Sequence, residues 1–395
     1  MPAVLRWTEL PSGTAMQSVI RNNPVLDELS NRRARARRTA VSAMSGGVDS
    51  SVATVLAVES GLAVAGVTMR LWSPGPGPLS EKVRQCCGPT AFEDARSAAE
   101  AAGIPHYIVN FENAFSRAVV DYFCREYLAG RTPNPCVACN NVVKFGALLQ
   151  FARALGAVTL ITGHYARIEH DRRGPHLLRA VDRTKDQSYM LAGLTRDQLS
   201  ALVMPLGTYT KQQTRAAARA WGLGVAEKPD SVDLCFVDGD YRSFIAQRFP
   251  DSIAPGPVMT LDGTVVGEHD GLLGFTVGQR RGLPENLSDG PWYVVRTDAR
   301  ANAVIVGRRE DLAKRTAICS NANIVQPDRF ARGEARGLAV TRYRSTGVSA
   351  RVRTLDSGAL SVAFEEPVPV LTPGQLLVLY DEDDREVLAS GIIQP

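Results

Sequence analysis

The stretch Ala40–Ser51, AVSAMSGGVDSS, decides the expected fold. Its apolar beginning is typical of a buried strand, and the apolar pattern that starts at Val52 predicts a helix. Between them, Gly46 and Gly47 allow a sharp turn and a close approach to a ligand. Backbone N–H groups at the start of the helix, together with three serine hydroxyls in the turn, are suited to phosphate oxygens. We therefore expect a phosphate-binding turn between a strand and a helix.

The turn does not have the pattern of a Walker loop, because no Lys-Ser/Thr pair follows a four-residue spacer, and it is not GxGxxG. SGGVDSS resembles the PP-loop of the ATP pyrophosphatases, which hold the β,γ-pyrophosphate of ATP and transfer AMP to a substrate oxygen. The alternative is a strand–helix turn that binds no ligand. The length of the match favours the nucleotide site.

Strand and helix patterns alternate from residue 40 to about 165, which predicts an α/β fold with a doubly wound parallel sheet. Further strands are expected at 63–71, 106–111 and 157–162, and helices at 92–102, 113–129 and 141–155. We expect Asn113 to cap the second helix and Asn140-Asn141 to cap the third. The turns at Ser45 and Gly163 both follow strands, at the sheet edge where ligands bind.

The second half of the chain has a different pattern. A hairpin turning at Gly174-Pro175 and a basic helix over 210–221 are expected first, and Pro and Gly become frequent after about residue 248. Alternating patterns beyond residue 309 predict a small antiparallel barrel. The expected divisions are an N-terminal extension (1–38), a PP-loop ATP-binding catalytic domain (39–243), a central domain (244–308) and a C-terminal β-barrel domain (309–395).

The chain has 395 residues and a net charge of +4. Seven arginines and three acidic residues in 1–38 account for that charge, so the remainder is neutral overall, and any nucleic-acid surface there must be a local patch. Arg32–Arg38 could assist RNA contact, but we favour a solvated arm or an upstream start codon. With no apolar run of 18 residues and no secretory pattern, we expect a cytoplasmic protein without membrane contact.

Seven cysteines without a secretory pattern indicate reduced thiols and redox or metal chemistry. We expect Cys139 beside a helix N-terminus and near Lys144, where the pKa of a thiol falls. Cys235 lies in an irregular polar stretch. Three interpretations stay open: a redox or persulfide pair of Cys139 and Cys235, a metal or Fe–S site on Cys136, Cys139 and Cys235 with or without Cys86-Cys87, and inert cysteines. Structural zinc is weakly supported by a single CxxC.

A set of motifs runs in order from about residue 43 to 377 and resembles the MnmA family of bacterial tRNA-specific 2-thiouridylases. The motifs are AMSGGVDSSV, the Cys86-Cys87 pair, FEDAR, GRTPNPCVACN with KF, TGHYAR, KDQSYML, SVDLCF, GFTVGQRRGL, TRYRS and TPGQ. The resemblance implies a PP-loop α/β domain, a small central domain and a C-terminal β-barrel, in agreement with the pattern above.

The resemblance also implies site residues. ATP would be bound by Ala43, Met44, Ser45, Gly46, Gly47, Val48, Asp49 and Ser50, with Met69 and Gly163 beside the adenosine. Cys139 matches the family's nucleophile and Cys235 its persulfide carrier. Asn134, Pro135 and Cys136 match the segment against the target base. Positions that contact tRNA match His164, Lys185, Asp186, Gln187, Arg342, Tyr343 and Gln375.

The implied activity is ATP-dependent 2-thiolation of the wobble uridine of tRNA. ATP adenylates the uracil oxygen, a persulfide on Cys235 supplies sulfur, and a Cys139–Cys235 disulfide is left for reduction. Mg²⁺ is expected to neutralise the triphosphate. The implied partners are tRNAs of the Lys, Glu and Gln type and a persulfide donor such as a cysteine desulfurase.

One departure from the family pattern is Cys136, where many relatives have an Asp proposed as an acid or base. It leaves proton handling unassigned and strengthens the Fe–S alternative. Ala43 in place of a commoner Gly is a minor difference. The rival functions are another PP-loop tRNA thiolase using an Fe–S cluster, a cytidine thiolase, an amidotransferase-type synthetase and a non-catalytic tRNA-binding protein. No glutamine-amidase nucleophile pattern supports the synthetase.

Overall fold

The structure is a computed structural model that describes residues 39–73, 88–230, 234–237, 239–250, 253–284, 287 and 290–395. Internal contacts divide the chain into two compact units. The first comprises Met1–Ala118 and Val137–Phe236, and the second comprises Val119–Cys136 and Val237–Pro395. The N-terminal extension and the Cys86-Cys87 pair lie outside the described residues. The domain boundaries expected at residues 243 and 308 stay predictions.

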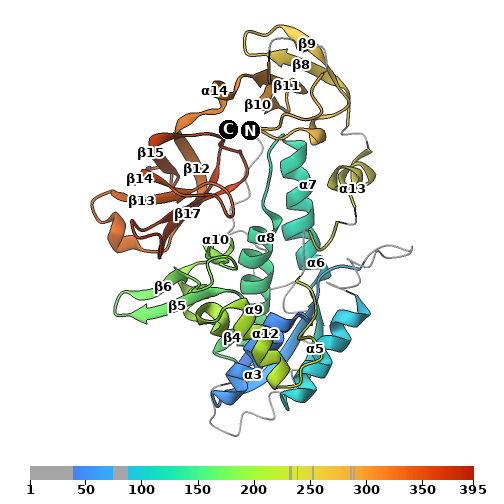
Figure 1. Ribbon diagram of the computed structural model, residues 1–395, viewed down its shortest axis with the longest axis vertical. Helices are drawn as coiled ribbons and strands as arrows, with labels where there is room; N and C mark the ends of the chain where they lie inside the picture. The colour runs from blue at the N-terminus through green and yellow to red at the C-terminus, as the bar shows by residue number, and fades with distance from the viewer. Residues whose placement is uncertain are drawn as a thin grey trace. The chain divides into compact units, whose positions relative to one another are not determined.

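A five-stranded parallel sheet in the order β3-β2-β1-β4-β7 forms the centre of the first unit (Figure 1). The strands are β1 (Thr39–Ala43), β2 (Ala63–Arg70), β3 (His106–Asn110), β4 (Thr159–Ile161) and β7 (Leu202–Val203). Because β1 pairs with β2 on one side and with β4 on the other, the strand order reverses there. Ligands of such sheets bind at the carboxyl ends of the strands beside this reversal. The expected doubly wound α/β fold is confirmed.

Helices cover this sheet, and α3 packs against α12 and the short turn η4. Their contact is apolar, with Val52, Val55, Leu206 and Ala218 buried in one cluster. The described helices here are α3 (Val48–Glu59), α5 (Pro89–Ala101), α6 (Glu112–Phe115), α9 (Leu148–Ala154), α10 (Ser188–Leu191), α11 (Arg196–Ser200), α12 (Lys211–Ala220) and η4 (Pro205–Thr208). The helices therefore cover the faces of the sheet, and loops follow the carboxyl ends of its strands.

Two predicted helix caps are wrong. The helix expected from Asn113 begins at Glu112, whose N–H is accepted by the Asn110 side chain at 2.9 Å. It continues as a π-helical segment, η2 (Ser116–Val120), and as α7 (Asp121–Leu128). Both caps failed because asparagine also fits inside helices, so its position alone does not mark a helix start.

The helix expected from Asn141 begins six residues earlier. It runs through α8 (Pro135–Ala138) and a π-helical segment, η3 (Cys139–Ala147), into α9. The Asn134 side chain accepts the N–H of Cys136 at 3.1 Å, so Asn134 performs the capping role that we assigned to Asn140-Asn141. Proline is favoured at the first helical position because its missing N–H needs no partner there.

The expected hairpin of the first unit is formed by β5 (Ala166–Asp171) and β6 (Gly174–Arg179). Its turn lies at Arg172-Arg173, not at Gly174-Pro175. The two residues that we expected to turn already belong to the ladder, since Gly174 pairs with Asp171 and Pro175 with His170. Glycine tolerates the φ of +115° found at position 174.

The second unit contains a four-stranded sheet in the order β10-β11-β8-β9, which precedes the barrel in sequence. Its strands are β8 (Gly256–Thr260), β9 (Val265–His269), β10 (Tyr293–Asp298) and β11 (Ala303–Gly307), with α13 (Tyr241–Arg248), η6 (Leu272–Gly274) and α14 (Arg309–Leu312) beside them in sequence. Val258, Val294, Val304 and Val306 form its core. In the same unit, Tyr241 of α13 stacks on Tyr127 of α7, with ring centroids 4.7 Å apart.

The remaining strands close a barrel in the order β12-β15-β14-β13-β16-β17, as expected. They are β12 (Lys314–Ile324), β13 (Glu334–Val340), β14 (Val348–Thr354), β15 (Leu360–Val368), β16 (Leu376–Tyr380) and β17 (Val387–Ile393), with the 3-10 turn η7 (Pro327–Phe330) after β12. Along β14, Ala350 and Val352 face the core while Arg351 and Arg353 are exposed. In the described part of the chain, no helix has the length and apolar character needed to cross a membrane.

Candidate functional site

The turn between β1 and α3 is held by its own serines. The Ser45 N–H donates to the Ser50 hydroxyl at 3.1 Å, and the hydroxyls of Ser50 and Ser51 donate to the Gly47 carbonyl at 3.1 and 2.9 Å. These two hydroxyls therefore stabilise the turn, whereas Ser45 is exposed. No side chain caps α3, so N–H groups of its first turn face the loop. These N–H groups and the positive end of the helix dipole are chemically suited to an anion.

Two glycines bring neighbouring backbone close to this turn. Gly46 has φ +70°, and a Cβ there would lie 2.1 Å from the Ala91 carbonyl oxygen at the start of α5. A Cβ on Gly163, just after β4, would lie 2.6 Å from the Ser50 nitrogen. The loops that follow β1 and β4 thus meet at the N-terminus of α3, beside the reversal of strand order.

Asp49 of the turn is bound by a lysine that sequence analysis missed. The Lys211 ammonium lies 2.7 and 2.8 Å from the two Asp49 carboxylate oxygens and 2.6 Å from Asp230. The Tyr165 hydroxyl also donates to Asp49, at 3.0 Å, and burial, with the Asp49 charge as a second cause, holds the pKa of this phenol far above its usual range. Lys211 is mostly buried, so its charge acts in a poorly solvated environment.

Lys228 is a second cation at the turn. Its ammonium donates to the Gly46 carbonyl at 2.9 Å and to Asp94 of α5 at 2.6 Å. Arg215 of α12 fixes the segment that carries it, by donating to the carbonyls of Ala226 and Lys228 at 2.6 and 3.0 Å. Lys211 had a weak sequence signal as a residue of the basic helix expected over 210–221, whereas no local pattern distinguished Lys228.

The ATP residues implied by resemblance are assembled at this edge. The Met44 N–H donates to the Val67 carbonyl at 2.9 Å, and the Thr68 hydroxyl donates to the Met44 carbonyl at 2.8 Å. Met69 follows near the carboxyl end of β2 and is partly exposed. Met69 therefore reaches the same sheet edge as the turn and Gly163.

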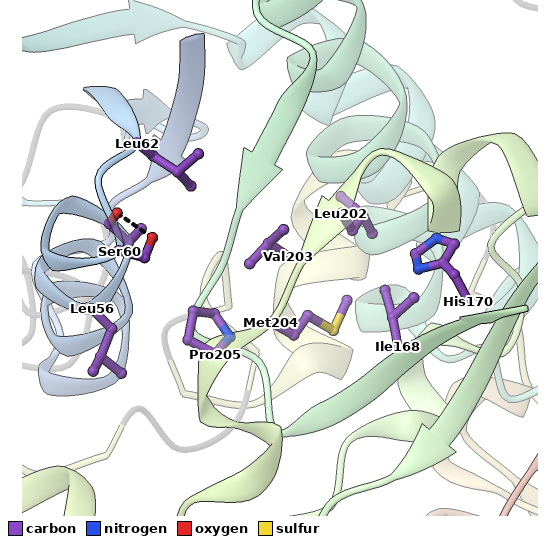
Figure 2. A pocket seen from close by; sticks show the side chains of 10 residues that line it. Leu56, Ser60, Leu62, Ile168, His170, Leu202, Val203, Met204 and Pro205 are labelled. Carbon is purple, nitrogen blue, oxygen red and sulfur yellow. Dashed lines mark hydrogen bonds between the residues drawn. The ribbon is translucent and has the colours of Figure 1, made fainter. Parts of the chain in front are cut away.

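A depression of about 350 Å³ lies elsewhere in the unit. Figure 2 shows Leu56, Ser60, Leu62, Ile168, His170 and Met204 around it. Leu56 and Ser60 belong to the C-terminal end of α3, roughly 15 Å along the helix from the turn. This depression is therefore distinct from the nucleotide turn.

Cys139 is 7% exposed and is the fifth residue of the helical run from Pro135, so it does not lie beside a helix N-terminus as we expected. The effect of a helix dipole fades beyond the first turn, so the dipole argument for an activated thiol weakens. Cys235 is partly exposed. Its neighbour Phe236 contacts Phe115 of α6, with ring centroids 5.7 Å apart, and α6 packs against η3. Cys139, the first residue of η3, and Cys235, the residue before Phe236, are thus both linked to α6 by neighbouring contacts.

The other described cysteines divide by exposure. Burial raises the pKa of Cys124 to about 11 and that of Cys319 to about 12, which keeps both thiols protonated and agrees with our interpretation of them as core residues. Cys136 is exposed. Among the described residues, no group of three or more His, Cys, Asp or Glu side chains could hold a metal ion.

His164 lies against Phe145, with ring centroids 5.4 Å apart, and its Nδ1 is 2.6 Å from the Thr162 hydroxyl. Burial and the Lys144 charge hold the pKa of His164 well below its usual value. The imidazole is therefore neutral. Lys144, which we placed near Cys139, acts electrostatically on His164.

The Lys185-Asp186-Gln187 segment is built into the fold. Asp186 is buried and accepts from Arg179 at 2.9 Å and from the Ser188 hydroxyl at 2.8 Å. Gln187 accepts the Tyr165 N–H at 2.9 Å. Lys185 pairs with Asp230 at 2.8 Å and remains partly exposed. Of the three, Lys185 offers the most accessible charge to a ligand.

In the second unit, Gln375 is bound to the segment that precedes α8. Its amide donates to the carbonyls of Thr132 and Pro133 at 2.8 and 3.4 Å. Gly374, with φ +93°, has no room for a Cβ beside Thr132. The Thr132 N–H in turn donates to Pro373 at 2.8 Å. The TPGQ turn thus holds the approach to Asn134 and Cys136, a contact between segments 240 residues apart that no local pattern reveals.

The turn between β13 and β14 carries Arg342 and Tyr343. Arg342 is exposed and Tyr343 partly so. The neighbouring Arg344, at φ +63°, places its guanidinium 5.1 Å from the Tyr343 ring centroid. Aromatic and guanidinium groups presented together suit a nucleic-acid surface.

The parallel sheet, the glycine-bent turn at the helix N-terminus and the two lysines around it define a nucleotide-binding domain of the PP-loop ATP pyrophosphatase class. Three family profiles match the chain in series. They are described as "tRNA methyl transferase HUP domain" over residues 38–239, "tRNA methyl transferase PRC-barrel domain" over 242–308 and "Aminomethyltransferase beta-barrel domain" over 316–393.

Two relatives match nearly end to end. A tRNA-specific 2-thiouridylase MnmA of Carboxydothermus hydrogenoformans is 44% identical over 365 residues, covering 91% of this chain and 98% of that protein. The one of Moorella thermoacetica is 46% identical over 355 residues, covering 89% and 98%. This chain belongs to the MnmA family of tRNA-specific 2-thiouridylases.

Proposed function

We propose that this protein is an ATP-dependent tRNA-uridine 2-sulfurtransferase. The observation that carries the proposal is the turn Ser45–Ser50 with Lys211 and Lys228 around it, in the same unit as Cys139 and Cys235. An enzyme that activates a carbonyl oxygen needs a site for departing pyrophosphate, and one that inserts sulfur needs a thiol. The chain carries both.

The nucleotide turn activates the uracil 2-oxygen. That oxygen attacks the α-phosphorus of ATP, pyrophosphate leaves, and the base becomes O-adenylated. Residues 43–50 bind the phosphates, with Met69 and Gly163 beside the adenosine. We assign Lys211 and Lys228 to the leaving pyrophosphate, because this polyanion at the turn would draw their ammonium groups from Asp49 and Asp94. The Asp–lysine pairs keep these cations in place before the nucleotide arrives.

The two thiols then transfer sulfur. The terminal sulfur of a Cys235 persulfide attacks C2 of the activated base, and AMP leaves with the oxygen. The Cys139 thiolate then attacks Sγ of Cys235. The bond between this Sγ and the sulfur on C2 breaks, and 2-thiouridine is released. A Cys139–Cys235 disulfide remains, and an external thiol donates two electrons to reduce it. A cysteine desulfurase is the proposed class of donor that recharges Cys235.

The substrate is tRNA, and the target is the wobble uridine of Lys, Glu and Gln isoacceptors. Asn134, Pro135 and Cys136 lie against the base, while His164, Lys185, Arg342 and Tyr343 contact the RNA. We assign Asp186, Gln187 and Gln375 to positioning, because the polar atoms named above are engaged within the protein. A wobble uridine must be unstacked to reach buried Cys139.

Mg²⁺ accompanies the nucleotide in this proposal. Asp49 of the turn and Asp94 of α5 are each paired with a lysine, so the phosphate oxygens would supply most of the ligands. When bound, the ion neutralises phosphate charge. The alternative Fe–S cluster on Cys136, Cys139 and Cys235 is not supported, and we assign the site to thiol chemistry. A cytoplasmic location follows from a tRNA substrate.

The decisive experiment incubates the purified protein with unmodified tRNA, ATP, Mg²⁺ and a persulfide donor, and analyses the nucleosides. We expect 2-thiouridine, with AMP and pyrophosphate released only when all components are present. A methylated uridine, or tRNA binding without AMP release, would refute the proposal. The matched control is the same reaction without ATP. A protein that binds tRNA without catalysis gives the same nucleosides in both reactions.

A further inference from the structure

Two arginines face each other across the outer surface of the barrel. The strands β13 and β14 are neighbours in the barrel (Figure 1). Arg336 of β13 and Arg351 of β14 are direct partners in their antiparallel ladder, and both side chains are exposed. Within the described residues, neither guanidinium forms a hydrogen bond or an ion pair. Like charges directly opposite each other destabilise a sheet. The pair therefore costs the barrel stability when the protein is alone.

The neighbouring position shows how the same ladder neutralises charge elsewhere. Glu334 is the direct partner of Arg353, and their side chains form an ion pair at 3.3 Å. On the other side of β14, Arg351 lies opposite Ala363 of β15 and has no acidic partner there. Arg336 and Arg351 therefore repel each other, whereas the neighbouring pair Glu334 and Arg353 attract each other.

The nearby acidic groups do not cancel the pair. Glu365 and Glu382 line a shallow depression of about 260 Å³ that Arg336 also borders. Neither carboxylate forms an ion pair with Arg336 in the described structure. The two carboxylates therefore lie near Arg336 without forming an ion pair with it, and Arg336 stays available to an external anion.

The hairpin also carries positive charge at its tip. The turn that joins β13 to β14 presents Arg342 and Arg344 with Tyr343. Arg336 and Arg351 lie four and three residues from the ends of that turn, a distance of roughly 13 Å along the strands. Guanidinium groups are therefore exposed both in the turn and on the outer surface of the strands that it joins.

We propose that the outer face of the β13–β14 hairpin binds the phosphate backbone of the tRNA substrate through Arg336 and Arg351. A phosphate between two opposed guanidiniums relieves their repulsion, and the planar fork of arginine matches phosphate oxygens. Phosphate contacts position an RNA without reading its sequence. The inference rests on the proposed tRNA substrate and extends its contact surface beyond Arg342 and Tyr343.

The test compares tRNA affinity at several salt concentrations for the wild type, the double variant R336Q/R351Q and the control R353Q. We expect the double variant to bind roughly tenfold more weakly at low salt. The slope of its log affinity against log salt concentration should be smaller in magnitude by about one to two. R353Q should change both values far less, because Arg353 is already paired with Glu334.

Thermal unfolding supplies the second measurement. Removal of the like-charge pair should leave the melting temperature of the double variant equal to or above that of the wild type. Unchanged affinity and salt slope, or an equal loss in R353Q, would overturn the inference, as would weaker binding that only accompanies unfolding. If the wild type binds no tRNA, the proposed function itself fails; if it thiolates tRNA while the double variant binds normally, only this inference fails.

Discussion

Gly46→Ala is the sharpest perturbation of the nucleotide turn. The added methyl group would lie 2.1 Å from the Ala91 carbonyl oxygen, whereas ordinary contacts begin near 3.4 Å, so the turn or α5 must move by more than 1 Å. At φ +70°, an alanine also costs about 1–2 kcal/mol. Overpacking adds about 1–3 kcal/mol. We expect the free energy of unfolding to fall by about 2–5 kcal/mol.

The same shift should weaken ATP binding. It displaces the Gly46 carbonyl, to which Lys228 donates, and the N–H groups at the start of α3. A hydrogen bond to a charged group contributes about 1.5–3 kcal/mol, so we expect the ATP affinity to fall at least about tenfold. Urea denaturation measures the stability, and calorimetric titration with ATP measures the affinity of variant protein shown to be folded by circular dichroism.

Gly47→Ala is the steric control for stability. Its methyl group would meet the Ser45 hydroxyl at 3.5 Å, an ordinary contact, and the backbone there is extended, with φ −101°. We expect its free energy of unfolding to stay within about 1 kcal/mol of the wild type. Wild-type stability and ATP affinity in Gly46→Ala would refute the argument that this glycine is required by close approach.

Three further outcomes are expected. Lys228→Met should weaken ATP binding at least about tenfold and leave AMP binding unchanged in titrations, because AMP lacks the β- and γ-phosphates to which we assign the ammonium group. Cys139→Ala and Cys235→Ala should each abolish 2-thiouridine formation and retain tRNA affinity, while Cys124→Ala keeps activity; thiolation by either of the first two would contradict the proposed transfer. The pKa of His164 is lowered in the folded protein, so as the pH falls through 6.5 this histidine is protonated in the unfolded chain but not in the folded one. The stability of the fold therefore decreases over that range. His164→Asn should flatten that decrease in urea titrations, and an unchanged slope would disprove it.

Local patterns predicted most of the fold. The buried strand and helix around the turn, the parallel sheet and the closed barrel all follow from hydrophobic periods of 2 and 3.6. The boundaries that failed were two helix starts, at Glu112 and Pro135, and the hairpin turn, which lies at Arg172-Arg173. An asparagine can cap a helix or lie within one, and the choice depends on which backbone N–H group each side chain reaches in the folded chain.

The site was predicted in part. The turn Ser45–Ser50 and its neighbour Gly163 lie together at the expected sheet edge, because loops after adjacent parallel strands share that edge. Lys211 and Lys228 were missed as nucleotide groups. They are more than 160 residues from the turn in sequence, and their ion pairs with Asp49 and Asp94 exist only after folding.

The sequence by itself determined the class of fold, the phosphate-binding turn, the cysteines and the family, since each is carried by a short run of residues or by an ordered set of motifs. Only the tertiary structure decided which cations surround the turn, that Gln375 supports Thr132, and that Arg336 faces Arg351. The physical reason is that charge pairing and strand register join segments distant in sequence, and their energies depend on distances that periodicity does not encode.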